Sequence, residues 1–505
     1  MADPRVFLVG AGPGDPGLIT VRGLTILRQA QVLLYDHLIS PQLLHEVPAD
    51  CEQVYVGKRA GKHILSQEQI NALMIEHAGN GRRVVRLKGG DPYVFGRGGE
   101  EALALNAAGI AFEVIPGITA ALGASAYAGI PLTHRNLAAD VAFITGHENL
   151  SRIDDSQIDW EALARWRGTI IFYMGIYRLP EICQRLMGFG MHAQTPAAVV
   201  QWGADARQRT HVATLGELPN IHEKHPFRPP GLIVIGQVVT LREQLNWFER
   251  SPLFGQSILV TRASEQAGEL VSKLQRCGAQ VIECPTVRIV PPEDVAPLRA
   301  ALSRLETFDW TIFTSVNAAV QVFALLERMQ RDARSFHRCR ICAVGSATRR
   351  RLADFGLRAD LVPPRYDAES LATTLLQQED VSGKRVLLPR SVIARSELPQ
   401  RLRDAGAEVE EVIAYQTLPD HTAAEELHKV LEKDRLDWVT FTSSSTVKGL
   451  LDIVDADTIR RHGLKIASIG PQTSKTLSQA GLQPTVQADP HTIDGLIAAI
   501  TAALS

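Results

Sequence analysis

The stretch Arg86-Leu-Lys-Gly-Gly-Asp-Pro-Tyr-Val-Phe-Gly-Arg-Gly-Gly99 is the most informative part of this 505-residue sequence. Its glycines let the backbone approach a ligand closely, and Asp91 could face a positively charged group. Around it the chain alternates short β-branched runs with longer helical patterns, as in Arg5-Val-Phe-Leu-Val9, then residues 17–30, then Val32-Leu-Leu-Tyr35. This alternation predicts an α/β fold with mostly parallel sheets.

A second glycine loop, Val9-Gly-Ala-Gly-Pro-Gly-Asp15, starts like a dinucleotide-binding motif but does not meet its spacing. In that motif, G-x-G-x-x-G, backbone N–H groups at a helix N-terminus bind the pyrophosphate. Here Asp15 occupies the third glycine position, where its carboxylate would repel a phosphate, and Pro13 has no N–H to donate. The loop therefore indicates a neutral or cationic ligand rather than NAD.

The composition excludes several classes of protein. At roughly 150 residues per domain, the length predicts about three domains. Lys and Arg number 53 against 55 Asp and Glu, so the net charge of −2 provides no bulk cationic field for nucleic acid. The sequence shows neither a secretory leader nor an apolar run of ~18 residues, which predicts a cytoplasmic protein without a membrane partner. No H-E-x-x-H occurs, and Cys339 and Cys342, the only C-x-x-C pair, are interpreted as packing, so no metal is expected.

Beyond a boundary expected near residue 252, the sequence repeats itself. Ile258-Leu-Val-Thr-Arg262 recurs 128 residues later as Val386-Leu-Leu-Pro-Arg390, and Phe313-Thr-Ser315 recurs at the same offset as Phe441-Thr-Ser443. A third pair, residues 343–348 and 468–473, matches at an offset of 125. A period this long predicts two related α/β units, with a cleft between them as the expected ligand site.

The N-terminal glycine loops, together with Tyr35-Asp-His-Leu, Val56-Gly-Lys-Arg and Pro116-Gly-Ile-Thr-Ala-Ala, resemble those of uroporphyrinogen-III C-methyltransferases over residues 5 to about 248. The resemblance implies the two-lobed tetrapyrrole methyltransferase fold of class III within residues 1–250, with lobes of about 1–115 and 116–250. It also implies S-adenosylmethionine as cofactor, whose cationic sulfonium agrees with the argument against a phosphate site.

The same resemblance implies particular site residues. Asp36 is the expected proton acceptor and Lys58 the expected proton donor, although an Asp at a strand end is often a loop anchor and Lys58 could instead pair with a substrate carboxylate. The matching positions for the cofactor are Pro13, Gly89, Gly90, Asp91, Val94, Thr119, Ala120, Met174 and Gly203. In isolation, Met174 would be interpreted as the core of a strand.

The duplicated half, residues 256–505, resembles uroporphyrinogen-III synthases. The resemblance implies two flavodoxin-like lobes joined by a two-stranded hinge, lobe one being 256–286 plus 417–505 and lobe two 288–415. It further implies cyclisation of hydroxymethylbilane with inversion of the last pyrrole ring. Such a reaction needs control of substrate conformation, which predicts weak polar contacts from Ser315, Thr348, Ser443 and Thr473, whose alternative role is helix N-capping. Tyr415 is the expected acid for departure of the substrate hydroxyl, with packing as the alternative.

The two resemblances together predict a bifunctional fusion. Its C-terminal half makes uroporphyrinogen III and its N-terminal half methylates that product twice to precorrin-2, for sirohaem or cobalamin biosynthesis. A methyltransferase with a non-catalytic tetrapyrrole-binding C-terminal module is the alternative, and a methyltransferase acting on a later corrin precursor is another. The N-terminal half is expected to form a homodimer. Clusters of arginine, among them Arg82, Arg83, Arg86 and Arg97, could serve the substrate carboxylates or form solvated faces.

Overall fold

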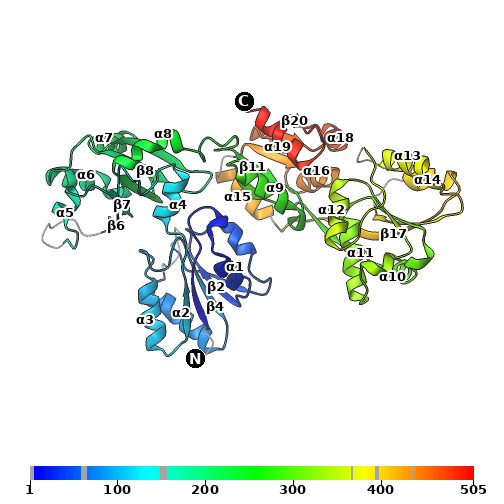
Figure 1. Ribbon diagram of the computed structural model, residues 1–505, viewed down its shortest axis with the longest axis horizontal. Helices are drawn as coiled ribbons and strands as arrows, with labels where there is room; N and C mark the ends of the chain where they lie inside the picture. The colour runs from blue at the N-terminus through cyan, green and yellow to red at the C-terminus, as the bar shows by residue number, and fades with distance from the viewer. Residues whose placement is uncertain are drawn as a thin grey trace. The chain divides into compact units, whose positions relative to one another are not determined.

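The computed structural model describes residues 5–57, 65–147, 156–364, 368–392, 397–422, 424–433 and 436–504, apart from the side chains of 264–266, 368, 426 and 433. The chain forms two compact units (Figure 1). The first holds the residues up to Ser257 and Lys273–Gln280, and the second holds Ile258–Ser272 and Val281–Ala503. Each unit contains two of the four five-stranded sheets.

The first sheet is parallel throughout and has the order β3-β2-β4-β1-β5. Its strands are β1 (Val6–Gly10), β2 (Val32–Tyr35), β3 (Glu52–Tyr55), β4 (Val84–Lys88) and β5 (Phe112–Ile115). Along β1 alternate side chains pack on opposite faces, Val6 and Leu8 toward one helix layer and Phe7 and Val9 toward the other. The layers are α2 (Gln67–Gly79) with α3 (Gly98–Ala107) on one face and α1 (Val21–Leu27) on the other (Figure 1). Because the strands are parallel, the loops that follow them emerge at one edge of the sheet.

The second sheet departs from the expected parallel arrangement, because most of its strand pairs are antiparallel. Its strands, in the order β6-β7-β10-β8-β9, are β6 (Val141–Thr145), β7 (Thr169–Tyr173), β10 (Gly231–Ile235), β8 (Pro196–Gln201) and β9 (Arg209–Thr214). Only β6 and β7 pair in parallel, while β10 is antiparallel to β7 and β8, and β8 is antiparallel to β9. Residues 202–208 connect β8 to β9, and so short a connection can join only antiparallel neighbours.

The segment from Pro219 to Gly231 has the composition of a loop but contains helix α7 (Leu218–Lys224). Pro219 lies in the first turn of this helix, where a proline is tolerated because its missing N–H would have no partner within the helix. The other helices of this part of the chain are α4 (Ala120–Tyr127), α5 (Trp160–Ala164), α6 (Leu179–Gly188) and α8 (Arg242–Leu245).

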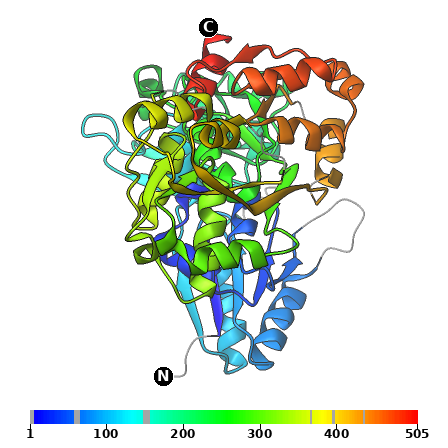
Figure 2. The same ribbon diagram turned by 90° about the vertical axis from the view of Figure 1, so that its right-hand side faces the viewer.

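The two sheets of the second unit have matching strand orders. The third sheet contains, in spatial order, β12 (Gln280–Glu283), β11 (Ser257–Val260), β18 (Trp438–Phe441), β19 (Lys465–Ser468) and β20 (Val486–Gln487). The fourth contains β13 (Val287–Val290), β17 (Glu408–Pro419), β16 (Arg385–Ser391), β14 (Trp310–Phe313) and β15 (Arg340–Ala343). Strands that repeat in sequence occupy equivalent positions, since β12-β11-β18-β19 corresponds to β17-β16-β14-β15. The long strand β17 also pairs antiparallel with β13 (Figure 2).

Helices follow the strands of this unit on the pattern expected of an α/β fold. They are α9 (Ser264–Arg276), α10 (Ala296–Ser303), α11 (Val316–Arg328), α12 (Ser346–Asp354), α13 (Ala368–Gln378), α14 (Glu397–Asp404), α15 (Ala424–Lys433), α16 (Ser444–Leu451), α17 (Ala456–Arg461), α18 (Pro471–Gln479) and α19 (Ile493–Ala502). Among the helices that the structure describes, none has both the length and the apolar character needed to cross a bilayer. The described residues also contain no group of three or more potential metal-ligating His, Cys, Asp or Glu side chains.

Candidate functional site

Three glycine loops meet at the carboxyl edge of the first sheet. Gly12 and Gly90 exchange backbone hydrogen bonds of 3.2 and 3.0 Å, which join the loops after β1 and β4. The loop after β5 packs on both, because a Cβ atom on Gly117 would lie 2.3 Å from the Gly90 carbonyl oxygen and 2.7 Å from the Gly10 Cα. Such distances leave no room for a side chain at Gly117, so glycine is required for this packing.

The loop after β1 also contacts the part of the unit that carries the second sheet. A Cβ atom on Gly14 would lie 2.5 Å from the backbone of Ala204. The Asp15 carboxylate does not project toward a ligand as its place in the glycine motif suggested. One oxygen accepts the Gly17 N–H at 2.7 Å, and the other accepts the Tyr127 hydroxyl at 2.5 Å. Burial, followed by the hydrogen bond to Asp15, raises the pKa of Tyr127 well above its usual range, so the phenol stays protonated as the donor.

Helix α4 lies between the predicted cofactor positions Pro13 and Gly203. A Cβ atom on Gly123 of this helix would lie 2.4 Å from the Pro13 ring, and one on Gly203 would lie 2.2 Å from the Ala124 methyl. The start of α4 is close to the second glycine loop, since a Cβ on Gly90 would lie 3.5 Å from the backbone nitrogen of Ala120. The structure therefore brings these predicted positions to one place.

Backbone strain concentrates in loops that carry predicted cofactor positions, among them Val94, Met174 and Gly203. Among the described residues, six positions other than glycine have a left-handed backbone, and five of them belong to segments 95–97, 174 and 202–204. These five are Phe95, Arg97, Met174, Trp202 and Ala204, with φ between 50° and 62°. A residue with a side chain is held in this region at a cost of about 1–3 kcal/mol, and such positions cluster where function requires them.

Asp91 has a different role from the one its sequence position suggested. One carboxylate oxygen accepts the backbone N–H groups of Tyr93 at 2.8 Å and Val94 at 3.2 Å, and the other accepts the Gly117 N–H at 3.0 Å. Its charge therefore organises the loops rather than projecting from them toward a cationic group.

Tyr173 is a functional candidate that the sequence motifs did not single out. Its hydroxyl lies 2.7 Å from the Thr119 hydroxyl and accepts the Ala121 N–H at 2.8 Å, so it ties β7 to the start of α4. Burial raises the pKa of this phenol. The next residue, Met174, is not strand core as its surroundings suggested, because it follows the end of β7 and its side chain is 51% exposed. In the sequence, only its position next to Met174, a predicted cofactor residue, pointed to Tyr173.

The assembled positions fit S-adenosylmethionine better than an anionic nucleotide. All the predicted cofactor positions except Asp91 are uncharged, and the Asp91 carboxylate already accepts three backbone N–H groups. Backbone groups and uncharged side chains at these positions are compatible with a zwitterionic ligand that carries a sulfonium. No cationic side chain stands among these positions to bind a phosphate.

Asp36 follows β2 at the same edge of the first sheet. One carboxylate oxygen accepts the Leu38 N–H at 3.0 Å, so Asp36 does anchor its own loop. The other lies 3.4 Å from the Arg86 guanidinium, and the side chain remains 22% exposed. Leu38 faces the glycine loop, because a Cβ on Gly89 would lie 2.8 Å from the Leu38 Cβ. Lys58, the predicted proton donor, lies outside the described residues.

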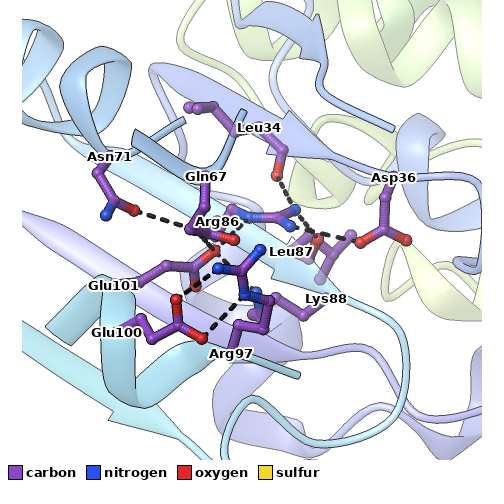
Figure 3. A network of polar contacts seen from close by, with 10 residues as sticks. All are labelled: Leu34, Asp36, Gln67, Asn71, Arg86, Leu87, Lys88, Arg97, Glu100 and Glu101. Atoms are coloured by element: carbon purple, nitrogen blue, oxygen red, sulfur yellow. Dashed lines mark hydrogen bonds and ion pairs between the residues drawn. The ribbon is translucent and has the colours of Figure 1, made fainter. Parts of the chain in front are cut away.

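Asp36 is joined through Arg86 to a buried charge network that also contains Lys88 and Glu101 (Figure 3). Arg86 and Lys88 project from the same face of β4, where they meet Glu101 of α3, which has no exposed surface. The Glu101 carboxylate accepts a hydrogen bond of 2.8 Å from Lys88 Nζ and one of 3.2 Å from Arg86 Nε. Burial, followed by repulsion from Arg86, lowers the pKa of Lys88, and the Glu101 carboxylate opposes this shift. Arg86 is thus 5% exposed, so of the two alternatives given for its cluster the solvated face does not apply to it.

In the second unit, the four predicted hydroxyl positions divide into two classes. Ser315 and Ser443 are N-caps, accepting the N–H of Ala318 at 3.1 Å and of Thr446 at 3.3 Å. For Thr348 and Thr473 the capping alternative is wrong. Each is buried and lies in the first turn of its helix, α12 or α18. The N-caps are Gly345 and Gly470, three residues before each threonine, because both helices begin earlier than expected.

Tyr415 lies inside β17 and is 9% exposed. Its hydroxyl accepts a hydrogen bond of 3.2 Å from the Ser315 hydroxyl. Two residues predicted separately, one hundred positions apart in the chain, are therefore in direct contact.

Comparison with known proteins gives matches in both halves. A family model for tetrapyrrole (corrin/porphyrin) methylases matches residues 5–219, and one for uroporphyrinogen-III synthase HemD matches residues 268–498. A porphyrin biosynthesis protein HemD from Ruminiclostridium josui is 37% identical, over 97% of this chain and 96% of its own. A uroporphyrinogen-III C-methyltransferase from Bacillus subtilis (strain 168) is 43% identical, over 66% of this chain and 68% of its own. The crystal structure of a uroporphyrin-III C-methyl transferase from Thermus thermophilus with S-adenyl homocysteine is 40% identical, covering 47% of this chain and 99% of its own with a TM-score of 0.40.

Proposed function

The chain belongs to the family of proteins that join a tetrapyrrole methylase to a uroporphyrinogen-III synthase, and on this basis we propose that it catalyses two consecutive reactions of porphyrin biosynthesis. The C-terminal half, residues 256–505, cyclises hydroxymethylbilane to uroporphyrinogen III. The N-terminal half, residues 1–250, then methylates this product twice to give precorrin-2. The product of one reaction is the substrate of the other, which gives a chemical reason for the fusion.

The convergence of the glycine loops is the observation that carries the methyltransferase proposal. Backbone approach at Gly12, Gly90 and Gly117 supports a rigid, uncharged surface for the cofactor. S-adenosylmethionine supplies the methyl group when bound. The residues of the loops then have to hold cofactor and pyrrole carbon in line, an effect worth roughly 7–11 kcal/mol in well-oriented reactions.

Methylation of a pyrrole carbon must be followed by loss of a proton, and we assign this step to Asp36. One of its carboxylate oxygens accepts the Leu38 N–H and the other pairs with Arg86 at 3.4 Å, while the side chain as a whole remains partly exposed at the sheet edge. Lys58 is proposed as the proton donor of the same reaction.

For the cyclisation we assign Tyr415 as the acid that protonates the departing hydroxyl of hydroxymethylbilane. Ser315, Thr348, Ser443 and Thr473 are proposed to guide the substrate through weak polar contacts. Because hydroxymethylbilane also closes unaided to the type-I isomer, this half has mainly to direct the inversion of the last ring. A homodimer formed through the N-terminal half, and a cytoplasmic location, complete the proposal.

The experiment is to supply the purified full-length protein with hydroxymethylbilane, with and without S-adenosylmethionine, and to resolve products by isomer and methyl count. The proposal expects uroporphyrinogen III without the cofactor and a dimethylated product with it. An incubation without protein gives the background of type-I isomer. Type-I product alone would contradict the synthase assignment, and unmethylated type-III product in both arms would contradict the methyltransferase assignment.

A further inference from the structure

We propose that Ser315 is a positioning residue for the cyclisation: its hydroxyl donates a hydrogen bond to the Tyr415 phenol and so turns the phenol's own proton toward the substrate. The inference rests on the proposed acid role of Tyr415 and adds a residue through which that acid is oriented. Three observations support it: a bulge in β17, the hydrogen bonds of Ser315, and the contrast with Ser443 in the repeated lobe.

The bulge determines where Tyr415 projects. Along β17, Ile413 pairs with Arg390 of β16, but the next pair is Tyr415 with Ser391, so Ala414 is an extra residue. Ala414 and Tyr415 are consequently both buried, which breaks the alternation expected of a strand. Bulges recur beside active sites because they re-aim a side chain. From Gln416 onward, β17 pairs with β13 instead, so Tyr415 lies where the strand changes partner.

The hydrogen bonds of Ser315 are directional. Its oxygen accepts the Ala318 N–H at 3.1 Å, and its only proton is then donated to the Tyr415 oxygen at 3.2 Å. With a donor already occupying one lone pair of the phenol oxygen, the phenol proton is left to point elsewhere. When the phenol gives up that proton, negative charge develops on its oxygen. The Ser315 O–H stabilises this charge, and so does the positive N-terminal end of the 13-residue helix α11, which Ser315 caps.

The repeated lobe shows that helix capping alone does not require this contact. Ser443 stands 128 residues after Ser315, follows the equivalent strand and caps α16 in the same way. Its hydroxyl, however, lies 2.8 Å from that of Ser445. The duplicated fold therefore supplies the cap in both lobes, and the contact with a phenol is a particular feature of Ser315.

The test measures cyclisation rate and the ratio of type-III to type-I product in the full chain. Ser315→Ala is expected to lower type-III formation about five- to tenfold, the range for one lost hydrogen bond. If Ser315 acts through Tyr415, then Ser315→Ala combined with Tyr415→Phe costs no more than Tyr415→Phe alone. Ser315→Thr, which keeps the hydroxyl, is expected to restore most of the activity.

Asp455→Ala is the matched control, because Asp455 caps α17 through the Thr458 N–H at 2.6 Å and is not among the predicted site residues. The Asp455→Ala variant loses a helix cap but is expected to cyclise hydroxymethylbilane at the wild-type rate and isomer ratio. If Ser315→Ala fails to fold, Ser315→Gly removes the hydroxyl at a capping cost of only a few tenths of a kcal/mol.

Two results would overturn the inference: wild-type isomer ratios in the Ser315 variants lacking the hydroxyl, or losses that multiply in the double variant. A wild-type ratio in Tyr415→Phe would instead refute the acid role on which the inference depends, so the two failures are distinguishable.

Discussion

Replacing Glu101 by glutamine is expected to destabilise the first unit strongly. Glu101 has no exposed surface, and its Oε1 accepts both Lys88 Nζ and Arg86 Nε. Glutamine keeps the size and an acceptor oxygen but removes the charge, which leaves two cations buried without their shared anion. Breaking a buried ion pair by removing one partner costs about 3–5 kcal/mol, so Glu101→Gln is expected to lose that much unfolding free energy.

The neighbouring residue supplies the control. The Glu100 side chain is 53% exposed and pairs with Arg97 on the surface of α3, so Glu100→Gln is expected to cost less than about 1 kcal/mol. The assay is urea-induced unfolding of the full chain, followed by amide hydrogen exchange in peptides covering residues 84–107, which report on β4 and α3. Equal exchange in the two variants would refute the claim that Glu101 neutralises the cations of β4.

The cost of Glu101→Gln is also expected to depend on pH. Burial already lowers the pKa of Lys88 from 10.5, and without Glu101 it falls further. Between the folded pKa and 10.5 the unfolded chain binds more protons at this site, so folding stability rises with pH in that window. Because the window is wider in the variant, its deficit relative to wild type should shrink as the pH is raised from about 7 toward 10. A constant deficit would indicate that Lys88 does not lose its proton.

Three further substitutions test the two sites. Gly117→Ala places a methyl group 2.3 Å from the Gly90 carbonyl oxygen, so it should abolish methylation while the cyclisation continues; retained methylation in a product assay would contradict the loop packing. Asp36→Ala should slow single-turnover methylation about 10²- to 10⁴-fold with cofactor affinity intact, and an unchanged rate would remove Asp36 from the mechanism. Tyr415→Phe should shift the product toward the type-I isomer in a folded protein, and a wild-type isomer ratio would exclude the phenol as acid.

The convergence of the first site was predictable because its residues follow parallel strands. Asp36, Gly90 and Gly117 come after β2, β4 and β5, and the carboxyl ends of parallel strands meet at one edge. The strand order of the second sheet was not predictable in this way. A short β-branched run has the same appearance in a parallel and an antiparallel sheet, and only the length of the 202–208 connection distinguishes them.

The internal repeat predicted the matching strand orders of the second unit but not the contacts of its polar side chains. Ser315 and Thr348 were alike in sequence, each placed between a strand and a helix. The structure makes one an N-cap and buries the other within a helix, because capping depends on where the first turn begins. Contact between Ser315 and Tyr415 depends on the bulge at Ala414, which leaves no mark in the sequence.

The burial of Arg86 and Lys88 shows how the fold can reverse a local pattern. In Val84-Val-Arg-Leu-Lys88, alternation alone would place both cations on a solvated face. The strand is instead central in a parallel sheet, where helices cover both faces, so both cations must lie under a helix layer. An anion fixed on that layer then becomes necessary, and Glu101 provides it while Glu100, one residue earlier, stays in solvent. Because Lys88 leads directly into Gly89 and Gly90, and Arg86 reaches Asp36, this buried compensation fixes the strand end from which both the glycine loop and the proposed base are presented.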